Sequence, residues 1–183
     1  MAKLNQQSMK KNILYFFITI ILLAFSYKAI PSLYLKFIDS VPFEVVKNGS
    51  FSGEKLFSPW VRELPTTPEI AYIKNEELVI STNKHWQVVH QYILYKTGKK
   101  YKVSFDAKSN YSTRFRGEIF DYTDSTELGL LIGKSQNWRS NVFYFTAPEE
   151  IGHEIKIRFY PYDRLAKDGQ IWIDNVNIVL DAK

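Results

Sequence analysis

The chain has 183 residues, of which 45% are hydrophobic and 16% aromatic, and it contains no cysteine. This composition is ample for a hydrophobic core, and the missing cysteines exclude disulfides and thiolate metal sites. Residues 1–39 hold five basic residues and one acidic residue, whereas the remaining 19 basic and 18 acidic residues nearly balance. The net charge of +5 therefore belongs to the N-terminal segment and gives no reason to expect nucleic acid as a partner.

The N-terminal segment predicts a membrane anchor. Residues 1–12 are polar and carry three lysines, and residues 13–25 are apolar apart from Thr19. An extension to Ile30 gives an 18-residue helix, which is close to the length that crosses a bilayer. The lysines ahead of the span predict a cytoplasmic N-terminus and a periplasmic or extracellular C-terminal domain.

A cleaved signal peptide is the alternative, because Ala24-Phe25-Ser26 has the small-x-small pattern of a cleavage site. We favour the uncleaved anchor, since apolar residues continue beyond Pro31. The predicted single-pass protein then has four parts in chain order. They are a cytoplasmic segment (1–12), a transmembrane signal anchor (13–30), a juxtamembrane linker (31–41) and a folded domain (42–183).

The folded domain is predicted to be all-β. Apolar and polar residues alternate in short runs bounded by Gly, Pro, Asn and Asp, and no helical period lasts longer than two turns. The expected strands are 77–82, 86–95, 101–109, 114–122, 141–148, 154–160 and 170–180, with long loops at 57–74 and 122–138. Strands of this number and length are typical of a β-sandwich or jelly roll.

Two of these strands predict which side chains face the core. In 154–160, the alternation directs Ile155, Ile157 and Phe159 inward. In 170–180, Trp172 should lie on the face opposite to its isoleucine neighbours, and Asp174-Asn175 should interrupt the strand with a bulge.

Four motifs carry a family resemblance: NGSFSGEKLFSPW (48–60), residues 86–109, residues 138–148 and IRFY followed by GQIWIDNVNIV (157–179). In this order they resemble the motifs of carbohydrate-binding modules that accompany xylanases and β-glucanases. The resemblance implies a galactose-binding-like jelly roll, here preceded by one N-terminal transmembrane helix. Most matching residues are core or turn positions, so Trp60 and Trp138 are expected to pack rather than to bind a ligand.

The resemblance also implies where a glycan would bind, namely on the concave face of one sheet or at its rim. Sugar rings stack on aromatic planes, and their hydroxyls bond to polar side chains. The expected contacts with a polysaccharide or oligosaccharide are Trp86, Gln91, Asp106, Arg116, Glu118, Phe120, Tyr122, Arg158, Tyr160 and Trp172. The alternative for Arg116, Glu118 and Arg158 is a solvated ladder of ion pairs.

A structural calcium ion is a further implication of the resemblance, and Asp174 matches the family's ligand in the last strand. The acidic partner in the first strand is absent, because Ser50-Phe51-Ser52 stands in its place and Glu54 comes two residues later. The alternative for Asp174 is a bulge in which its carboxylate bonds to a local amide.

Catalytic motifs are lacking. The histidines do not have zinc-ligand spacing, and Glu118 and Asp121 should lie on opposite faces of one strand. We therefore predict a non-catalytic, membrane-anchored glycan-binding module at the outer face of the cytoplasmic membrane. The alternative is an accessory subunit of a membrane protein complex that uses the sandwich as a protein-interaction platform.

Overall fold

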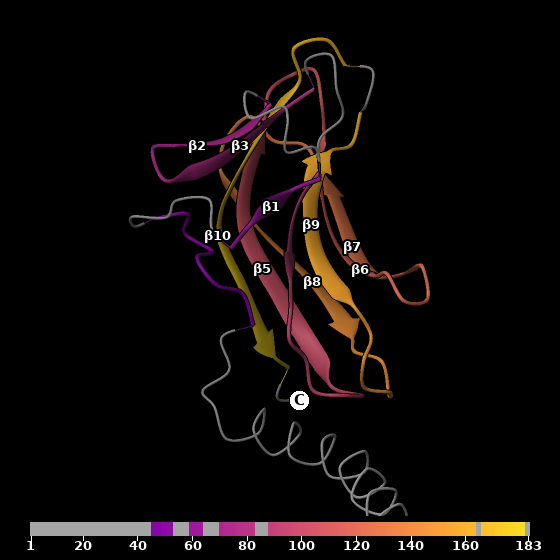
Figure 1. Ribbon diagram of the computed structural model, residues 1–183. Coiled ribbons are helices and arrows are strands. Elements are labelled where there is room, and N and C mark those ends of the chain that lie inside the picture. Colours follow the sequence, from indigo (N-terminus) through magenta and orange to yellow (C-terminus); the bar gives the residue numbers. More distant parts are fainter. Residues whose placement is uncertain (1–44, 53–58, 64–69, 83–87, 164–165, 182–183) are drawn as a thin grey trace, which may run out of the picture. The chain divides into compact units, whose positions relative to one another are not determined.

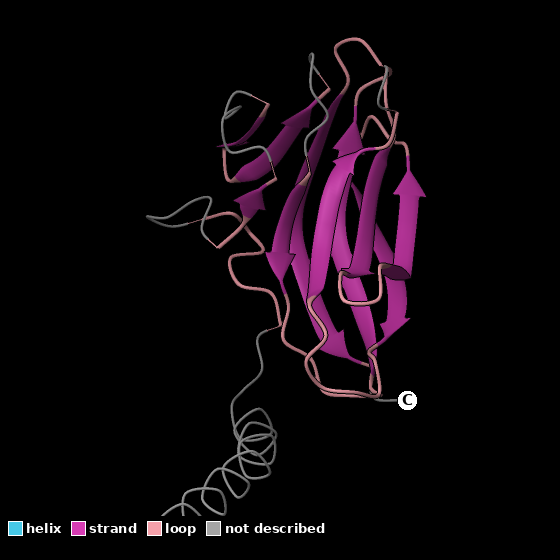
Figure 2. Ribbon diagram, turned by 45° about the vertical axis from the view of Figure 1, so that its right-hand side comes forward, coloured by secondary structure: helices cyan, strands magenta, loops and turns pink. Residues whose placement is uncertain are grey.

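The computed structural model describes residues 45–52, 59–63, 70–82, 88–163 and 166–181, which belong to one compact unit, Glu44–Lys183. Every regular element in this part of the chain is a β-strand (Figure 2). No helix among the described residues is long and apolar enough to cross a membrane. The predicted anchor at 13–30 and the segments on either side of it lie outside these residues.

The described strands form two five-stranded antiparallel sheets (Figure 1). Sheet A consists of β1 (Val61–Arg62), β4 (Val89–Tyr92), β9 (Ile155–Pro161), β6 (Phe115–Asp121) and β7 (Thr126–Gly133), in this spatial order. Sheet B consists of β2 (Ala71–Lys74), β3 (Glu77–Ser81), β10 (Gln170–Leu180), β5 (Lys100–Ser109) and β8 (Arg139–Thr146). The all-β prediction is confirmed.

The two sheets share one hydrophobic core. Phe105 of β5 packs against Phe159 of β9 with ring centroids 5.1 Å apart, and against Phe115 of β6 at 6.1 Å. Phe105 belongs to sheet B and its two partners belong to sheet A, so the sheets are the layers of a β-sandwich.

The predicted core positions of β9 and β10 are confirmed. Ile155, Ile157 and Phe159 are buried, as are the two isoleucines on either side of Trp172, although Lys156 and Tyr160 of β9 are buried too. The register of β10 against β5 shifts between Asp174 and Asn177, which is the expected bulge. Asn175 adopts a left-handed conformation with φ of 50°, a conformation that asparagine tolerates better than most residues.

The N-terminal motif closes the sandwich beside this bulge. The Val176 amide donates a hydrogen bond to the Gly49 carbonyl at 2.9 Å, and a Cβ added to Gly49 would lie 1.9 Å from the Val176 oxygen. Trp60 packs on the rings of Phe51 and Phe159, and its Nε1 donates to the carbonyl of Asn48. The expected packing role of Trp60 is confirmed.

The loop predicted at 122–138 is wrong, because residues 126–133 form β7. Its glycines resemble turn residues in the sequence, yet close packing explains them here. A Cβ on Gly129 would lie 2.6 Å from the Tyr144 oxygen, and one on Gly133 would lie 2.4 Å from the Phe115 ring. A strand can carry glycine where another chain segment approaches this closely.

Two further boundaries differ from the predictions. The strand expected at 86–95 is shorter, because β4 ends at Tyr92, while residues 86 and 87 lie outside the described part. The loop expected at 57–74 contains β1, and β2 occupies its last four residues. Both strands lie at sheet edges and are too short to show a clear alternation of apolar and polar residues.

Candidate functional site

Six of the ten predicted glycan contacts meet on the outer face of sheet A, the side turned away from the core. They come from β6, from the residue after it and from β9, and they are Arg116, Glu118, Phe120, Tyr122, Arg158 and Tyr160. Strand register brings them together: Glu118 stands opposite Arg158, and Arg116 stands opposite Tyr160. Arg158 in turn faces His90 of β4.

Glu118 is the centre of this face and is fully buried. Its Oε2 accepts hydrogen bonds from Arg116 Nε at 2.5 Å and from the Tyr160 hydroxyl at 2.8 Å, and its Oε1 forms an ion pair with Arg158 Nη2. Arg116 also pairs with Glu127 of β7. The face is therefore a desolvated network rather than a solvated ladder of ion pairs.

Aromatic rings lie among these charges. The Arg158 guanidinium lies 4.0 Å from the centroid of Phe120, which packs edge-on against Tyr122 at 5.0 Å. Lys156 Nζ lies 3.8 Å from the Tyr122 ring and 4.4 Å from the Tyr92 ring. Cations held over rings in this way fix the aromatic planes that a sugar would contact.

Hydrogen bonds from hydroxyls extend the network to the edge of the sheet. Arg158 Nη1 donates to the Tyr122 hydroxyl at 3.1 Å, and this hydroxyl donates to Glu63 at 2.9 Å. Burial is the main cause that raises the pKa of Tyr160, and the hydrogen bond to Glu118 raises it further. Burial also raises the pKa of Tyr122. Both phenols are therefore neutral hydrogen-bond donors at physiological pH.

One row of this face has unused hydrogen-bonding capacity. Within the described part of the chain, His90 Nδ1 and Arg158 Nε are buried without a hydrogen-bond partner, and the two residues stand directly opposite each other. Burial lowers the pKa of His90, and Lys156 lowers it further, so its ring is neutral. A hydroxyl, from water or from a ligand, would supply the missing partners.

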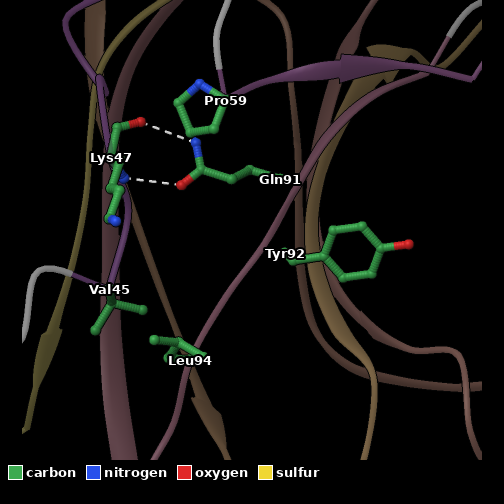
Figure 3. Close-up of a pocket in the computed structure, with 6 residues that line it drawn as sticks. All are labelled: Val45, Lys47, Pro59, Gln91, Tyr92 and Leu94. Atoms are coloured by element: carbon green, nitrogen blue, oxygen red, sulfur yellow. Dashed lines mark hydrogen bonds between the residues drawn. The ribbon is translucent and has the colours of Figure 1, made fainter.

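A pocket of about 240 Å³ lies beside this face, at the edge of β4 (Figure 3). Val45, Lys47, Pro59, Gln91, Tyr92 and Leu94 line it. The Gln91 amide donates to the Lys47 carbonyl and accepts from the Lys47 amide, both at 2.8 Å, and its side chain is buried. Gln91 therefore joins the segment around Lys47 to β4, and its buried side chain has little surface for the predicted glycan contact.

Tyr92 points away from Gln91 in Figure 3 and lines both the pocket and the outer face of sheet A. It is 55% exposed, the most open aromatic side chain of this region. The pocket is smaller than the 300–1,000 Å³ typical of sites for drug-sized ligands, so it has room for little more than one ring.

The other predicted contacts lie elsewhere. Asp106 and Trp172 lie on the outer face of sheet B, the opposite layer of the sandwich. Trp86 lies outside the described residues. Trp138, which was expected to pack, is instead 38% exposed, and Lys108 Nζ lies 4.3 Å from its ring. The predicted residues thus divide between two separate faces.

Asp174 has the geometry of a bulge residue, because its Oδ1 accepts a hydrogen bond from the next amide at 2.7 Å. Burial raises its pKa, as do Asp106, Glu77 and Glu76. Calcium binding by Asp174 stays a prediction; a fall in melting temperature on chelation with EGTA would support it, and an unchanged temperature would contradict it.

Among the described residues, one group of three carries potential metal ligands, namely Asp121, Asp124 and His153. His153 Nδ1 lies 2.6 Å from Asp121, whose other oxygen accepts the Thr123 amide. The hydrogen bond with Asp121 raises the pKa of His153. This short contact favours a hydrogen-bonded pair that joins the end of β6 to the loop before β9.

Sequence reasoning missed several residues of the outer face of sheet A: Glu63, His90, Tyr92, Glu127 and Lys156. Glu63 and Glu127 lie in segments for which the sequence predicts loops, so it assigns no strand face to them. The period-two alternation of β4 and β9 was a usable signal for the other three, because it places them on the same side as Arg158.

Several solved structures share this fold. A carbohydrate-binding module described as CBM4 is 19% identical, with a TM-score of 0.58 over 74% of this chain and 99% of that one. The N-terminal cellulose-binding domain of a Cellulomonas fimi β-1,4-glucanase is 15% identical, with a TM-score of 0.56 over 76% of this chain and 98% of that one. TmCBM61 in complex with β-1,4-galactotriose is 18% identical, with a TM-score of 0.53 over 75% of this chain and 99% of that one.

The class of fold is therefore defined: the chain has a jelly-roll β-sandwich similar to those of these carbohydrate-binding modules. At these identities the likeness concerns the fold alone. No family model matches the sequence, and no curated protein matches it either.

Proposed function

We propose that the chain is a non-catalytic glycan-binding module whose ligand lies on the outer face of sheet A. The observation that carries the proposal is the convergence of Tyr92, Phe120 and Tyr122 with Arg116 and Arg158 on one sheet face. Aromatic planes next to fixed polar groups suit the apolar faces and the hydroxyls of a sugar chain.

The buried row across this face supports a hydroxyl-bearing ligand. A buried polar atom without a partner costs about 1–3 kcal/mol, so His90 Nδ1 and Arg158 Nε favour any ligand that reaches them. Glu118 would not act as a catalytic acid here, because two arginines hold it in ion pairs. Its role is to position Arg116 and Arg158.

The test is a calorimetric titration of the full-length chain, purified in a detergent without a sugar headgroup, against cellohexaose, xylohexaose, β-1,4-galactotriose and soluble cell-envelope polysaccharides. We expect saturable binding to at least one of them. A folded chain that binds none contradicts the proposal.

We further propose that residues 13–30 anchor the module in a membrane, with the sandwich on the periplasmic or extracellular side. The apolar run and the lysines before it support this arrangement. The chain should stay in the membrane pellet after alkaline carbonate extraction, and protease added to spheroplasts, which exposes the outer side of the cytoplasmic membrane, should digest its C-terminal part. Release into the supernatant would contradict the anchor.

A protein-interaction role for the sandwich stays a prediction. Co-purification in mild detergent tests it, because an accessory subunit should retain its partner. A chain that purifies alone under conditions that preserve its neighbours contradicts this alternative.

A further inference from the structure

A second row of aromatic side chains crosses the outer face of sheet B. Trp172 of β10 stands opposite Lys108 of β5. Because Ala107 pairs with Arg139, the first residue of β8, Trp138 immediately before this strand lies beside Lys108 on its other side. Lys108 Nζ lies 4.3 Å from the Trp138 ring and 5.3 Å from the Trp172 ring. The row ends at β3, because Val79, which pairs with Trp172, is only 1% exposed.

The spacing of the two tryptophans fits a particular polymer. They stand two strands apart, which is roughly 9–10 Å. A β-1,4-linked pyranose chain is a flat ribbon in which every second ring presents the same face, and its two-ring repeat has about this length. One such chain laid across β8, β5 and β10 would place alternate rings over Trp138 and Trp172.

Polar groups beside the row suit sugar hydroxyls. Lys108 pairs with Glu77 at 3.6 Å, and the Asp106 carboxylate accepts a hydrogen bond from Asn175 at 2.9 Å. Asp106 and Asp174 stand opposite each other one position further along the outer face, so this surface also carries negative charge. Acidic glycans would be repelled here, whereas neutral ones would gain hydrogen-bond acceptors.

We propose that Trp138, Lys108 and Trp172 form a second glycan-binding site, on the layer opposite to the first, for a neutral β-1,4-linked chain. It shares a ligand class with the proposed function but uses none of the same residues. A chain with two such sites on opposite faces would bind two strands of a polysaccharide at once and gain avidity on a polymer.

Cellohexaose is the probe, titrated into the full-length chain in a detergent without a sugar headgroup. The variants are Trp138→Ala and Trp172→Ala, with Tyr144→Ala as the matched control because Tyr144 is an exposed aromatic residue of β8 outside the row. Each tryptophan variant, made in a Tyr92→Ala background, should weaken binding about threefold to tenfold. Tyr144→Ala should leave it unchanged.

Maltohexaose, whose α-1,4 linkages give a curved chain, should not bind this row. Unchanged cellohexaose affinity in both tryptophan variants, with near-ultraviolet circular dichroism showing intact folds, overturns the proposal. A changed oligomeric state in Trp138→Ala without a change in affinity also overturns it, in favour of an interface between two copies of the chain.

The two proposals fail separately. If Tyr92→Ala alone abolishes cellohexaose binding, the site on sheet A stands and the second site is contradicted. If only the tryptophan variants lose affinity, the second site stands and the site on sheet A is contradicted. Absence of any binding contradicts both.

Discussion

At the residue scale, Glu118 determines the arrangement of the candidate site on sheet A. It is a carboxylate with no exposed surface, and it is tolerated because Arg116, Arg158 and Tyr160 all direct donors at it. Without it, two guanidinium groups would face each other across neighbouring strands. The order of the candidate face therefore depends on a residue that has no exposed surface of its own.

Replacement of Glu118 should accordingly be costly. We expect Glu118→Ala to lower the free energy of unfolding by about 3–5 kcal/mol, because the arginines are left unpaired in a desolvated site. Glu127→Ala is the control, since Glu127 also pairs with Arg116 but is one-third exposed, and it should cost less than about 1 kcal/mol. Urea denaturation followed by circular dichroism measures both. Equal costs would contradict the central role of Glu118.

Single residues also show what the sequence could predict about this site. Period-two alternation placed Arg116 and Glu118 on one face of their strand, and the family resemblance added Arg158 of another strand to that face. It could not reveal that Glu118 is buried, since the burial results from partners on β9 and from a tyrosine 42 positions away. The family resemblance likewise failed for Trp138, which was expected to pack but is 38% exposed beside Lys108 of β5.

At the element scale, the hairpin between β2 and β3 is made by a two-residue turn. Asn75 and Glu76 both have positive φ, at 53° and 61°, as a type I′ turn requires. Asparagine tolerates this conformation, whereas glutamate is strained in it by about 1–2 kcal/mol.

Relief of this strain should stabilise the fold. Glu76→Gly should raise the free energy of unfolding by about 0.5–1 kcal/mol, because the flexibility of glycine in the unfolded chain offsets part of the gain. Asn75→Gly at the neighbouring position should change it little. Thermal melts of the two variants against the unaltered chain check this, and a destabilised Glu76→Gly variant would show that the side chain has another role.

A second element-scale feature joins the turn after β6 to the loop before β9. The hydrogen bond between His153 and Asp121 raises the pKa of His153, so the folded state favours the protonated ring. This contribution to stability is complete below the ordinary histidine pKa of about 6.5 and is lost as the pH rises through the raised pKa of the folded chain.

The melting-temperature difference between the unaltered chain and His153→Gln should therefore be largest near pH 5.5 and shrink as the pH rises above about 6.5. In an Asp121→Asn background, which keeps the amide-capping oxygen, the pH dependence of this difference should become smaller, because Asp124 and Glu150 still raise the pKa of His153. A difference that grows with pH would contradict the protonated pair.

At the scale of the whole molecule, the jelly roll presents two outer faces of different chemistry. The outer face of sheet A has buried charges beneath partly open rings, and the outer face of sheet B has a tryptophan row beside partly buried polar side chains. The alternating strands predicted this architecture, except that β1, β2 and β7 were missed, because they lie in segments expected to be loops. In β7, Gly129 and Gly133 are explained by close packing against other strands. Such close contacts join segments that are distant in the sequence, so a local sequence pattern cannot predict them.

The central claim is that a glycan lies on the outer face of sheet A, and the most direct test is the affinity of one exposed ring there. Calorimetric titration of the best-binding oligosaccharide should show Tyr92→Ala weakened about threefold to tenfold relative to the unaltered chain. Tyr111→Ala, which removes an exposed tyrosine away from this face, should bind normally. Equal affinities for the unaltered chain and the folded Tyr92→Ala variant would contradict the claim.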